Sequence, residues 1–233
     1  MTIAIIAAME EEADVLRNKI CNCRTLTIAG CRFDNGTLAG EAVVLMQSGI
    51  GKVNAALGTA LLIDRFHPDA VINTGSAGGT DPALQIGDVI ISDGVFHHDV
   101  DATAFGYAPG QVPGMPETYR ADARLVDRAV KAAPSGMNAP HYLVGTIGSG
   151  DVFMADDARL AALKVKFPAM KAVEMEAAAI AQTCYRFGVP FIIIRALSDI
   201  AGSSSAVSFN QFLKTAATHS AAFVLDFIQQ IKE

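Results

Sequence analysis

Short apolar runs alternate along the chain with longer segments of helical periodicity. The most apolar run is 191–194, where a phenylalanine precedes three consecutive isoleucines. A run of this kind predicts a strand that is buried on both faces. The pattern then changes abruptly to Arg195, Ser198 and Asp199. Ligands of open α/β sheets bind outside the carboxyl ends of the strands, so Asp199 is a candidate for chemistry. A helix cap or an ion pair with Arg195 is the open alternative.

The same alternation predicts the other elements and the turns between them. Strands are expected at 2–8, 24–38, 41–47, 70–73, 88–96, 141–147, 172–173 and 191–194, and helices at 10–20, 52–66, 121–133, 156–165, 175–187 and 209–231. Turns are expected at 34–36 and 39–40, small-residue loops at 74–79 and 202–205, a break at 134–136, and one long loop at 97–119. This order of elements indicates a three-layer α/β fold, and we expect a single domain over 1–233.

Composition narrows the class of protein further. The chain is 51% hydrophobic and 18% charged, which is enough apolar material for a large core, and the excess hints at a surface buried against a second copy. A net charge of −6 without a basic run argues against nucleic-acid or anionic-membrane partners. No stretch approaches the roughly 20 apolar residues of a membrane span. Four cysteines without CxxC spacing suggest reduced thiols in a cytosolic protein.

Polar side chains follow several of the expected strands. Glu12 comes after the first strand, the 74–79 loop after the fourth, Ser149 after the sixth, and Glu174 and Glu176 after the next. If these strands are neighbours, carboxylates and glycines converge at one edge of the sheet. Acidic residues at a helix start are commonly only caps that complement the helix dipole, so this alternative stays open for Glu176.

Familiar catalytic and binding motifs are absent. Residues 49–52 read GIGK but lack the first glycine of a phosphate-binding Walker loop, and no G-x-G-x-x-G or G-x-S-x-G occurs. His97, His98, Asp99 and Asp101 are metal-ligand types, although loops often carry them without a metal. We therefore expect neither a metal nor a cofactor.

Eight segments, taken together and in order, carry a family resemblance. They are IAAMEEE at 6–12, SGIGKVNAA at 48–56, NTGSAGG at 73–79, DATAFGY at 101–107, GQVPG at 110–114, SGDVF at 149–153, VEME at 173–176 and RALSD at 195–199. The chain resembles, over its full length, the 5′-methylthioadenosine/S-adenosylhomocysteine nucleosidase family of the purine nucleoside phosphorylase-like superfamily. The resemblance implies a three-layer α/β/α sandwich with a central mixed β-sheet, assembled as a homodimer in the cytoplasm.

The resemblance also implies an activity and a set of site residues. The family hydrolyses the N-glycosidic bond of methylthioadenosine and S-adenosylhomocysteine, with 5′-deoxyadenosine as a further candidate substrate, and serves methionine salvage. Glu12 would activate water and Asp199 would protonate adenine N7. The ribose would contact Glu176, Met175, Ser76 and Arg195. Because a direct ion pair would lower the pKa of Asp199, we expect Arg195 to face Glu176 or the sugar site instead. The remaining substrate-binding residues implied are Phe153, Met154, Ala77, Gly78 and Ser198 around the adenine, Met9, Ile50 and Phe209 around the 5′ group, and Phe105 and Pro113 from the partner subunit.

These residue types suit the reaction. Adenine leaves more readily when an acid protonates a ring nitrogen, and burial would raise the pKa of Asp199 to allow it. A second carboxylate on the opposite face activates water, as in inverting glycosidases. Departures from the family pattern are small. Ala4 and Ala7 replace common glycines, Met154 replaces a branched aliphatic residue, and 202–205 differ from many relatives.

Three other functions remain open. A purine nucleoside phosphorylase would need a cationic phosphate site, whereas the first loop here carries Glu10, Glu11 and Glu12, which repel phosphate. A futalosine-type hydrolase has closely similar motifs. A catalytically silent nucleoside-binding protein is the third possibility, although both proposed catalytic carboxylates are present.

Overall fold

The computed structural model describes residues 1–133, 141–202 and 204–231. The strands of its sheet are β1 (Thr2–Ala7), β2 (Cys21–Ile28), β3 (Cys31–Leu38), β4 (Glu41–Gln47), β5 (Ala70–Gly79), β6 (Val89–His97), β7 (Tyr119–Arg120), β8 (Tyr142–Ser149), β9 (Met170–Glu174) and β10 (Phe191–Ile200). The helices are α1 (Glu10–Arg17), α2 (Lys52–Phe66), the short 3₁₀ helix η1 (Thr103–Phe105), α3 (Ala123–Ala132), α4 (Asp157–Lys166), α5 (Ala177–Phe187) and α6 (Ser205–Ile231).

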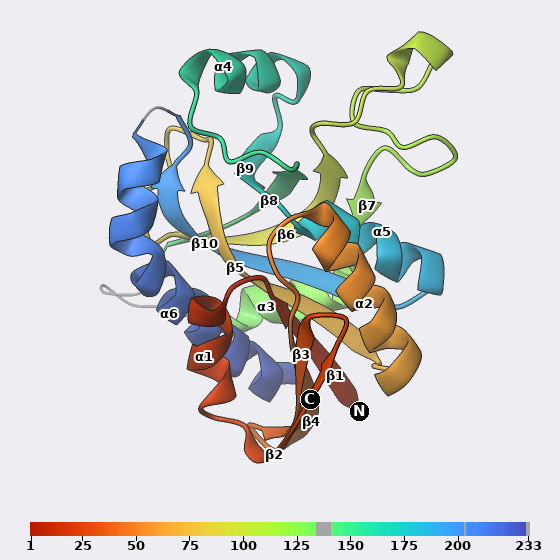
Figure 1. The fold of residues 1–233 in the computed structure, drawn as a ribbon. Coiled ribbons are helices and arrows are strands. Elements are labelled where there is room, and N and C mark those ends of the chain that lie inside the picture. The colour runs from red at the N-terminus through yellow and green to blue at the C-terminus, as the bar shows by residue number, and fades with distance from the viewer. Residues whose placement is uncertain (134–140, 203, 232–233) are drawn as a thin grey trace.

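The sheet is mixed, and its order places three strand ends together. β1 pairs in parallel with β4 and β5, and β5 pairs in parallel with β10, so the carboxyl ends of β1, β5 and β10 lie at one edge. β10 also pairs with β6, which closes the path β5–β9–β8–β6–β10 back onto β5 (Figure 1). The end of β9 reaches the same edge, because Val173 pairs with Gly78.

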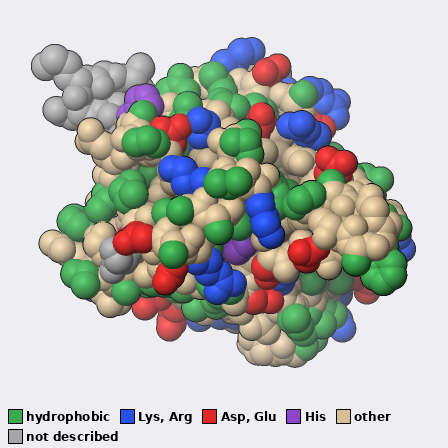
Figure 2. All heavy atoms as spheres, turned by 90° about the horizontal axis from the view of Figure 1, so that it is seen from above, with side chains coloured by type: hydrophobic (Ala, Val, Ile, Leu, Met, Phe, Trp, Pro, Cys, Tyr) green, Lys and Arg blue, Asp and Glu red, His purple; other side chains and the backbone are tan. Residues whose placement is uncertain are grey.

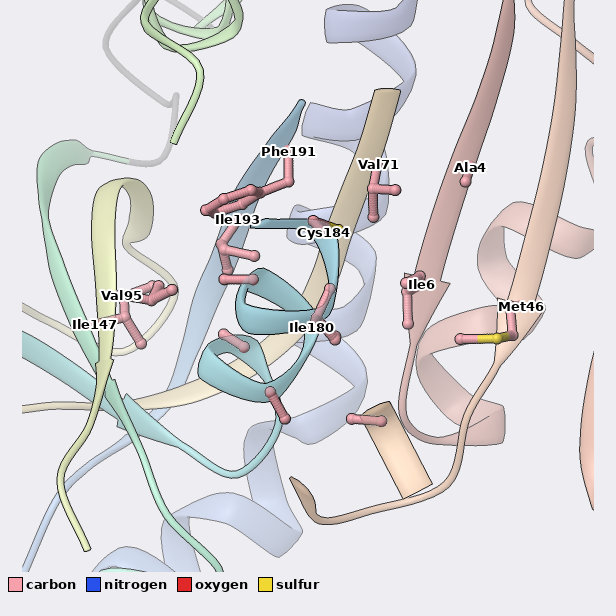
Figure 3. Close-up of a cluster of buried hydrophobic side chains, with 14 of the residues drawn as sticks. Ala4, Ile6, Met46, Val71, Val95, Ile147, Ile180, Cys184, Phe191 and Ile193 are labelled. Atoms are coloured by element: carbon pink, nitrogen blue, oxygen red, sulfur yellow. The ribbon is translucent and has the colours of Figure 1, made fainter. Parts of the chain in front are cut away.

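Two apolar layers cover the sheet and make the fold three-layered. On one face, α1, α3 and α6 pack over a cluster that includes Ile5, Ile194 and Phe227. On the other face, α2 and α5 pack together. Figure 3 shows Ile180 and Cys184 of α5 among side chains from several strands. α4 lies above the sheet, and its Leu163 joins a small third cluster (Figure 1).

Local chemistry explains several helix ends. Asp122 caps α3, because its side chain accepts hydrogen bonds from the amides of Arg124 and Leu125 at 2.9 and 3.2 Å. α2 ends at His67, which adopts the left-handed conformation with φ 45° and is followed by Pro68, a residue that cannot continue a helix. Three acidic residues in the first turn of α1 complement its dipole.

The three-layer fold with a mixed sheet is confirmed, but four local predictions are wrong. The turn expected at 34–36 lies inside β3, and the hairpin turns instead at Ala29 and Gly30, which have φ 50° and 80°. The loop expected at 74–79 continues β5, and β10 runs on past Arg195 to Ile200. α6 begins at Ser205, before the expected 209. The break at 134–136 and Ser203 lie outside the described residues.

The surface seen from above is of mixed character. Acidic, basic and hydrophobic side chains are interspersed over the face in Figure 2. Among the described residues, none of the helices combines the length and apolar character needed to cross a bilayer.

Candidate active site

One cavity of about 290 Å³ opens at the shared strand edge. Its walls come from the ends of β1, β5, β9 and β10. Residues 152–154, Ile50 and Phe209 complete them. The lining residues are Ala8, Met9, Glu12, Ile50, Ser76, Ala77, Gly78, Val152, Phe153, Met154, Val173, Glu174, Met175, Glu176, Arg195, Ser198, Asp199 and Phe209. Four carboxyl groups and one guanidinium group line it, so the cavity disfavours an anionic ligand and favours a cationic one.

Glu12 is held in the first turn of α1 and is 2% exposed. One carboxylate oxygen accepts hydrogen bonds from the backbone amides of Ala8 and Met9 at 3.1 and 3.2 Å. The other oxygen accepts from the amide and the hydroxyl of Ser76, both at 2.9 Å. Its side chain is therefore fixed between the end of β1 and the middle of β5, inside the cavity.

Asp199 reaches the same cavity from β10. The pairing of β10 with β5 is irregular between Leu197 and Asp199, and such bulges re-aim side chains. Asp199 is 3% exposed, and its burial raises the pKa of the carboxyl group, although the hydrogen bond from the Ser198 hydroxyl at 2.8 Å opposes this. Gly78 makes room for it, because a Cβ there would lie 2.8 Å from Asp199 Oδ2.

Arg195 is completely enclosed among acceptors. Its guanidinium lies 3.3 Å from Glu176 Oε2, the partner expected from the sequence, and 2.6 Å from Glu174 Oε2, which was not expected. It also bonds Asn73 Oδ1 at 2.8 Å. The second oxygen of Glu176 accepts from the amide of Gly51 at 2.9 Å. Burial and the neighbouring charge of Glu174 raise the pKa of Glu176 to about 8, against the opposing effect of Arg195.

Part of the cavity lining is apolar. Phe153 and Phe209 meet edge to face with ring centroids 5.5 Å apart, and Phe153 is partly exposed. Met9 and Ile50 also line the cavity. Aromatic, thioether and aliphatic groups of this kind make soft contacts with a hydrophobic substituent.

Two expected site residues lie elsewhere in this chain. Phe105 and Pro113 do not line the cavity, and Phe105 is 84% exposed on η1. The sequence analysis placed them in the site of a neighbouring subunit, so their position here neither supports nor contradicts that assignment. The other 14 residues named as catalytic or substrate-binding in the sequence analysis line the one cavity.

The histidine-rich segment at 97–101 has other partners. His97 bonds the side-chain oxygen of Gln182 at 2.8 Å, and Asp99 pairs with Lys52 at 2.6 Å. Among the residues described, no group of three or more candidate ligands is arranged to hold a metal ion.

Sequence reasoning gave no role to three buried polar residues at the site, namely Glu174, Ser149 and Asn73. Glu174 was considered only together with Glu176, because the sequence does not show which of these two side chains faces the sheet edge. Asn73 was read as the end of a strand that in fact continues. The sequence did offer one clue. A polar residue next to an apolar strand costs free energy to bury unless it has a hydrogen-bonding partner, so each of these residues implies a partner nearby.

Comparison with known proteins agrees with this architecture. The family model of the phosphorylase superfamily matches residues 2–229. A 5′-methylthioadenosine/S-adenosylhomocysteine nucleosidase of Geobacillus kaustophilus is 57% identical over 233 residues, covering 100% of this chain and 99% of that protein.

Two crystal structures of such nucleosidases superpose over almost the whole chain. The Colwellia psychrerythraea protein, in complex with adenine, has a TM-score of 0.96 and 46% identity, covering 99% of this chain and 95% of that one. The Neisseria meningitidis protein, in complex with methylthio-immucillin-A, has a TM-score of 0.95 and 48% identity, with 98% of each chain covered. This chain therefore belongs to the phosphorylase superfamily and, within it, to the 5′-methylthioadenosine/S-adenosylhomocysteine nucleosidase family.

Proposed function

We propose that the protein hydrolyses the N-glycosidic bond of 5′-methylthioadenosine and S-adenosylhomocysteine, releasing adenine and the 5-thio-ribose product. The observation that carries this proposal is the delivery of two buried carboxyl groups, Glu12 and Asp199, into one cavity from different elements. The relatives named for this activity are similar over the full length, and two of their structures hold adenine or a nucleoside analogue.

Asp199 is the proposed acid. Burial raises the pKa of its carboxyl group, so it holds a proton more readily than an exposed aspartate does. It then donates that proton to N7 of the leaving adenine. The donors and apolar groups of Ser198, Gly78 and Phe153 surround the place where the base would lie.

Glu12 is the proposed base for the attacking water. Its four hydrogen bonds fix the carboxylate, and acid or base assistance of this kind is worth about 10²–10⁴-fold. As the bond breaks, the sugar acquires oxocarbenium character, and the carboxylates of Glu12 and Glu174 stabilise that positive charge. We expect inversion at C1′, as in glycosidases with an acid and a base on opposite faces.

Glu176 is the proposed acceptor for the ribose hydroxyls, with Met175, Ser76 and Arg195 beside it. Met9, Ile50 and Phe209 would take the thioether group at the apolar end. Arg195, the one cation in the cavity lining, is already paired with two carboxylates, which supports hydrolysis over transfer to phosphate.

A homodimer is proposed as the working form. Large apolar side chains are exposed on α2 and α5, including Val53 at 76%, Tyr185 at 56% and Phe187 at 50%. A second copy would cover them, and its exposed Phe105 and its Pro113 would complete the 5′ pocket. We also propose one nucleosidase domain over 1–233, a cytoplasmic location and a role in methionine salvage.

The test is adenine release from methylthioadenosine in phosphate-free buffer. Futalosine, inosine, S-adenosylhomocysteine and 5′-deoxyadenosine form the substrate panel. Glu12→Gln should lose most turnover, whereas Glu11→Gln, which removes an exposed neighbouring carboxylate, should not. Release that requires phosphate would indicate a phosphorylase, and a preference for futalosine would indicate the other hydrolase. A stable, unhydrolysed complex with wild-type protein would indicate a binding protein.

A further inference from the structure

Glu174 is an extensively bonded carboxylate in the cavity lining. It ends β9, and its side chain is 3% exposed. One oxygen accepts three hydrogen bonds, from Arg195 Nη2 at 2.6 Å and from the amides of Glu176 and Ala177 at 2.9 Å each. The other accepts from the hydroxyl of Ser149, which in turn accepts from the amide of Ala178 at 2.7 Å. Glu174 therefore joins β8, β10 and the start of α5.

Arg195 is the group on which these contacts converge. Its Nη2 lies closer to Glu174 than to Glu176, at 2.6 against 3.3 Å. Its Nη1 donates to the carbonyl of Ser76 at 3.1 Å, and the hydroxyl of the same serine donates to Glu12. A guanidinium released from Glu174 would have Glu176 as its nearest remaining carboxylate and would turn toward the ribose side of the cavity.

We infer that Glu174 is a positioning residue for the proposed reaction, which holds the guanidinium of Arg195 back and so leaves Glu176 free to receive the sugar hydroxyls. The inference rests on the proposed function. Glu174 acts through Arg195 and through the amide of Glu176.

The electrostatics of Glu176 give this role a measurable consequence. The charged groups that face Glu176 are Glu174 from β9, Arg195 from β10 and Glu12 from α1, and the amide of Gly51 faces it from the start of α2. The charges of Glu174 and Glu12 raise the pKa of Glu176, while Arg195 and the amide lower it. Removing the charge of Glu174 removes one cause of the raised pKa of Glu176. It also frees Arg195 to pair more closely with Glu176. The pKa of Glu176 must then fall.

The test is Glu174→Gln in a double-mutant cycle with Arg195→Gln. The glutamine keeps the size and an acceptor oxygen for the amides of Glu176 and Ala177, so it removes mainly the charge. We expect kcat to fall about 10²-fold, the cost of a small misplacement in an active site, with a smaller change in KM. In the Arg195→Gln background the same substitution should have little further effect, because residues that act as a unit are not additive.

The pH profile separates positioning from a general structural effect. The limb of the kcat/KM profile that disappears in Glu176→Gln reports the ionisation of Glu176. In Glu174→Gln we expect this limb to move to lower pH by about one unit or more. Glu174→Asp keeps the charge, so its limb should stay in place. Glu10→Gln, an exposed carboxylate on α1, is the control and should match wild type.

Each outcome decides the inference. Thermal unfolding first shows which variants are folded. If Glu174→Gln is not, Glu174→Asp takes its place in the double-mutant cycle, where it should lower kcat in the wild-type background and have little further effect beside Arg195→Gln. A folded Glu174→Gln with wild-type kcat and an unmoved limb would overturn the inference, as would an equal loss in both Arg195 backgrounds. If wild-type protein itself releases no adenine, the proposed function fails instead.

Discussion

The surroundings of Asp199 support the acid role proposed for it. It is 3% exposed and, among the described residues, accepts a hydrogen bond from the hydroxyl of Ser198. Glu12, by contrast, is fixed by four hydrogen bonds from backbone and hydroxyl donors. Burial disfavours the charged form of Asp199, so the two environments support the proposed acid role of Asp199 and the proposed base role of Glu12.

Replacing Asp199 by asparagine tests the acid role. The amide keeps the size and the hydrogen bond with Ser198 but has no proton of comparable acidity for adenine N7. We expect kcat for adenine release to fall by about 10²–10⁴-fold, with binding of a non-hydrolysable methylthioadenosine analogue retained. Calorimetry would measure that binding. The exposed Asp127→Asn on α3 is the control. Near-normal turnover in Asp199→Asn would show that another group supplies the proton.

The buried Glu176 makes the stability of the free protein depend on pH. Its pKa is raised from 4.5 to about 8, so between these values the folded protein holds a proton that the unfolded chain has lost. The stabilisation from this group is fully present below pH 4.5, declines as pH rises and is lost above about 8, at no more than about 1.4 kcal/mol per pH unit.

We therefore expect Glu176→Gln to flatten the decline of unfolding free energy with rising pH. Urea unfolding from pH 5 to about 8.5 would measure it in wild type and variant. Asp199, whose pKa is also raised, contributes a decline of the same sign and remains in both proteins, so the comparison isolates Glu176. An identical slope in the two proteins would mean that Glu176 keeps an ordinary pKa in the folded state.

At the scale of elements, β5 is the strand that brings Glu12 and the guanidinium of Arg195 together. Gly75 lies within it at φ 146°, and a Cβ there would lie 2.6 Å from Arg195 Nη1 and 2.7 Å from Glu12 Oε1. The strand can pass between these two groups only where it has no side chain. Gly75 is thus required both by its backbone conformation and by the space around it.

Gly75→Ala should therefore lower kcat/KM by about 10²-fold or more, because it displaces Glu12 or Arg195. The matched control is Gly30→Ala in the β2–β3 turn, which has φ 80° and no atom within 4 Å of the added Cβ. Both substitutions carry backbone strain of about 1–2 kcal/mol, which thermal unfolding would report. Only Gly75→Ala should lose activity, and equal activity in the two variants would contradict the crowding argument.

The elements also show what the sequence could and could not predict. Apolar runs and their alternation with helices located nearly every element, since burial on both faces leaves an unmistakable pattern at 191–194. The continuation of β5 through 74–79 was missed because glycine and serine are typical of loops. In this strand the glycines are needed because a Cβ at these positions would clash with neighbouring side chains. The Asn35–Gly36 pair suggested a turn, but Asp34 is buried in ion pairs with Arg17 and Arg32 that keep β3 extended.

The site was predictable to the extent that strand ends and motifs mark it. Local sequence could not show that Glu174 faces Arg195, because that contact depends on β9 and β10 meeting at the edge of β5. Nor could it distinguish a helix cap from a ribose acceptor at Glu176, which is in fact buried beside Arg195 at the start of α5. Tertiary pairing answers the first question, and it shows that the side chain of Glu176 makes no capping hydrogen bond. The ribose role of Glu176 stays a proposal.

At the scale of the whole molecule, the cavity and the exposed apolar surface lie near each other in the fold. α2 begins at Lys52, directly after the Gly51 amide that bonds Glu176, and carries the exposed Val53 and Leu57. If a second copy covers this surface, the active site and the interface share the start of one helix. The proposed contribution of Phe105 from the partner would then be a direct consequence of symmetry, since each copy of a two-fold dimer gives what it receives.

A hybrid dimer tests this exchange. Phe105→Ala removes the side chain that a subunit would give to its neighbour, and Asp199→Asn inactivates the subunit's own site. A dimer with one subunit of each kind, purified through two different tags, would have one site that combines the intact Asp199 of one subunit with the intact Phe105 of the other. We expect this hybrid to turn over methylthioadenosine faster than the mean of the two parent homodimers, with KM near the wild-type value. Within its own chain, the Phe105 side chain is 84% exposed and does not line the cavity. Activity equal to the mean of the parents, or full activity in a species that sedimentation shows to be monomeric, would mean that each chain builds its pocket alone.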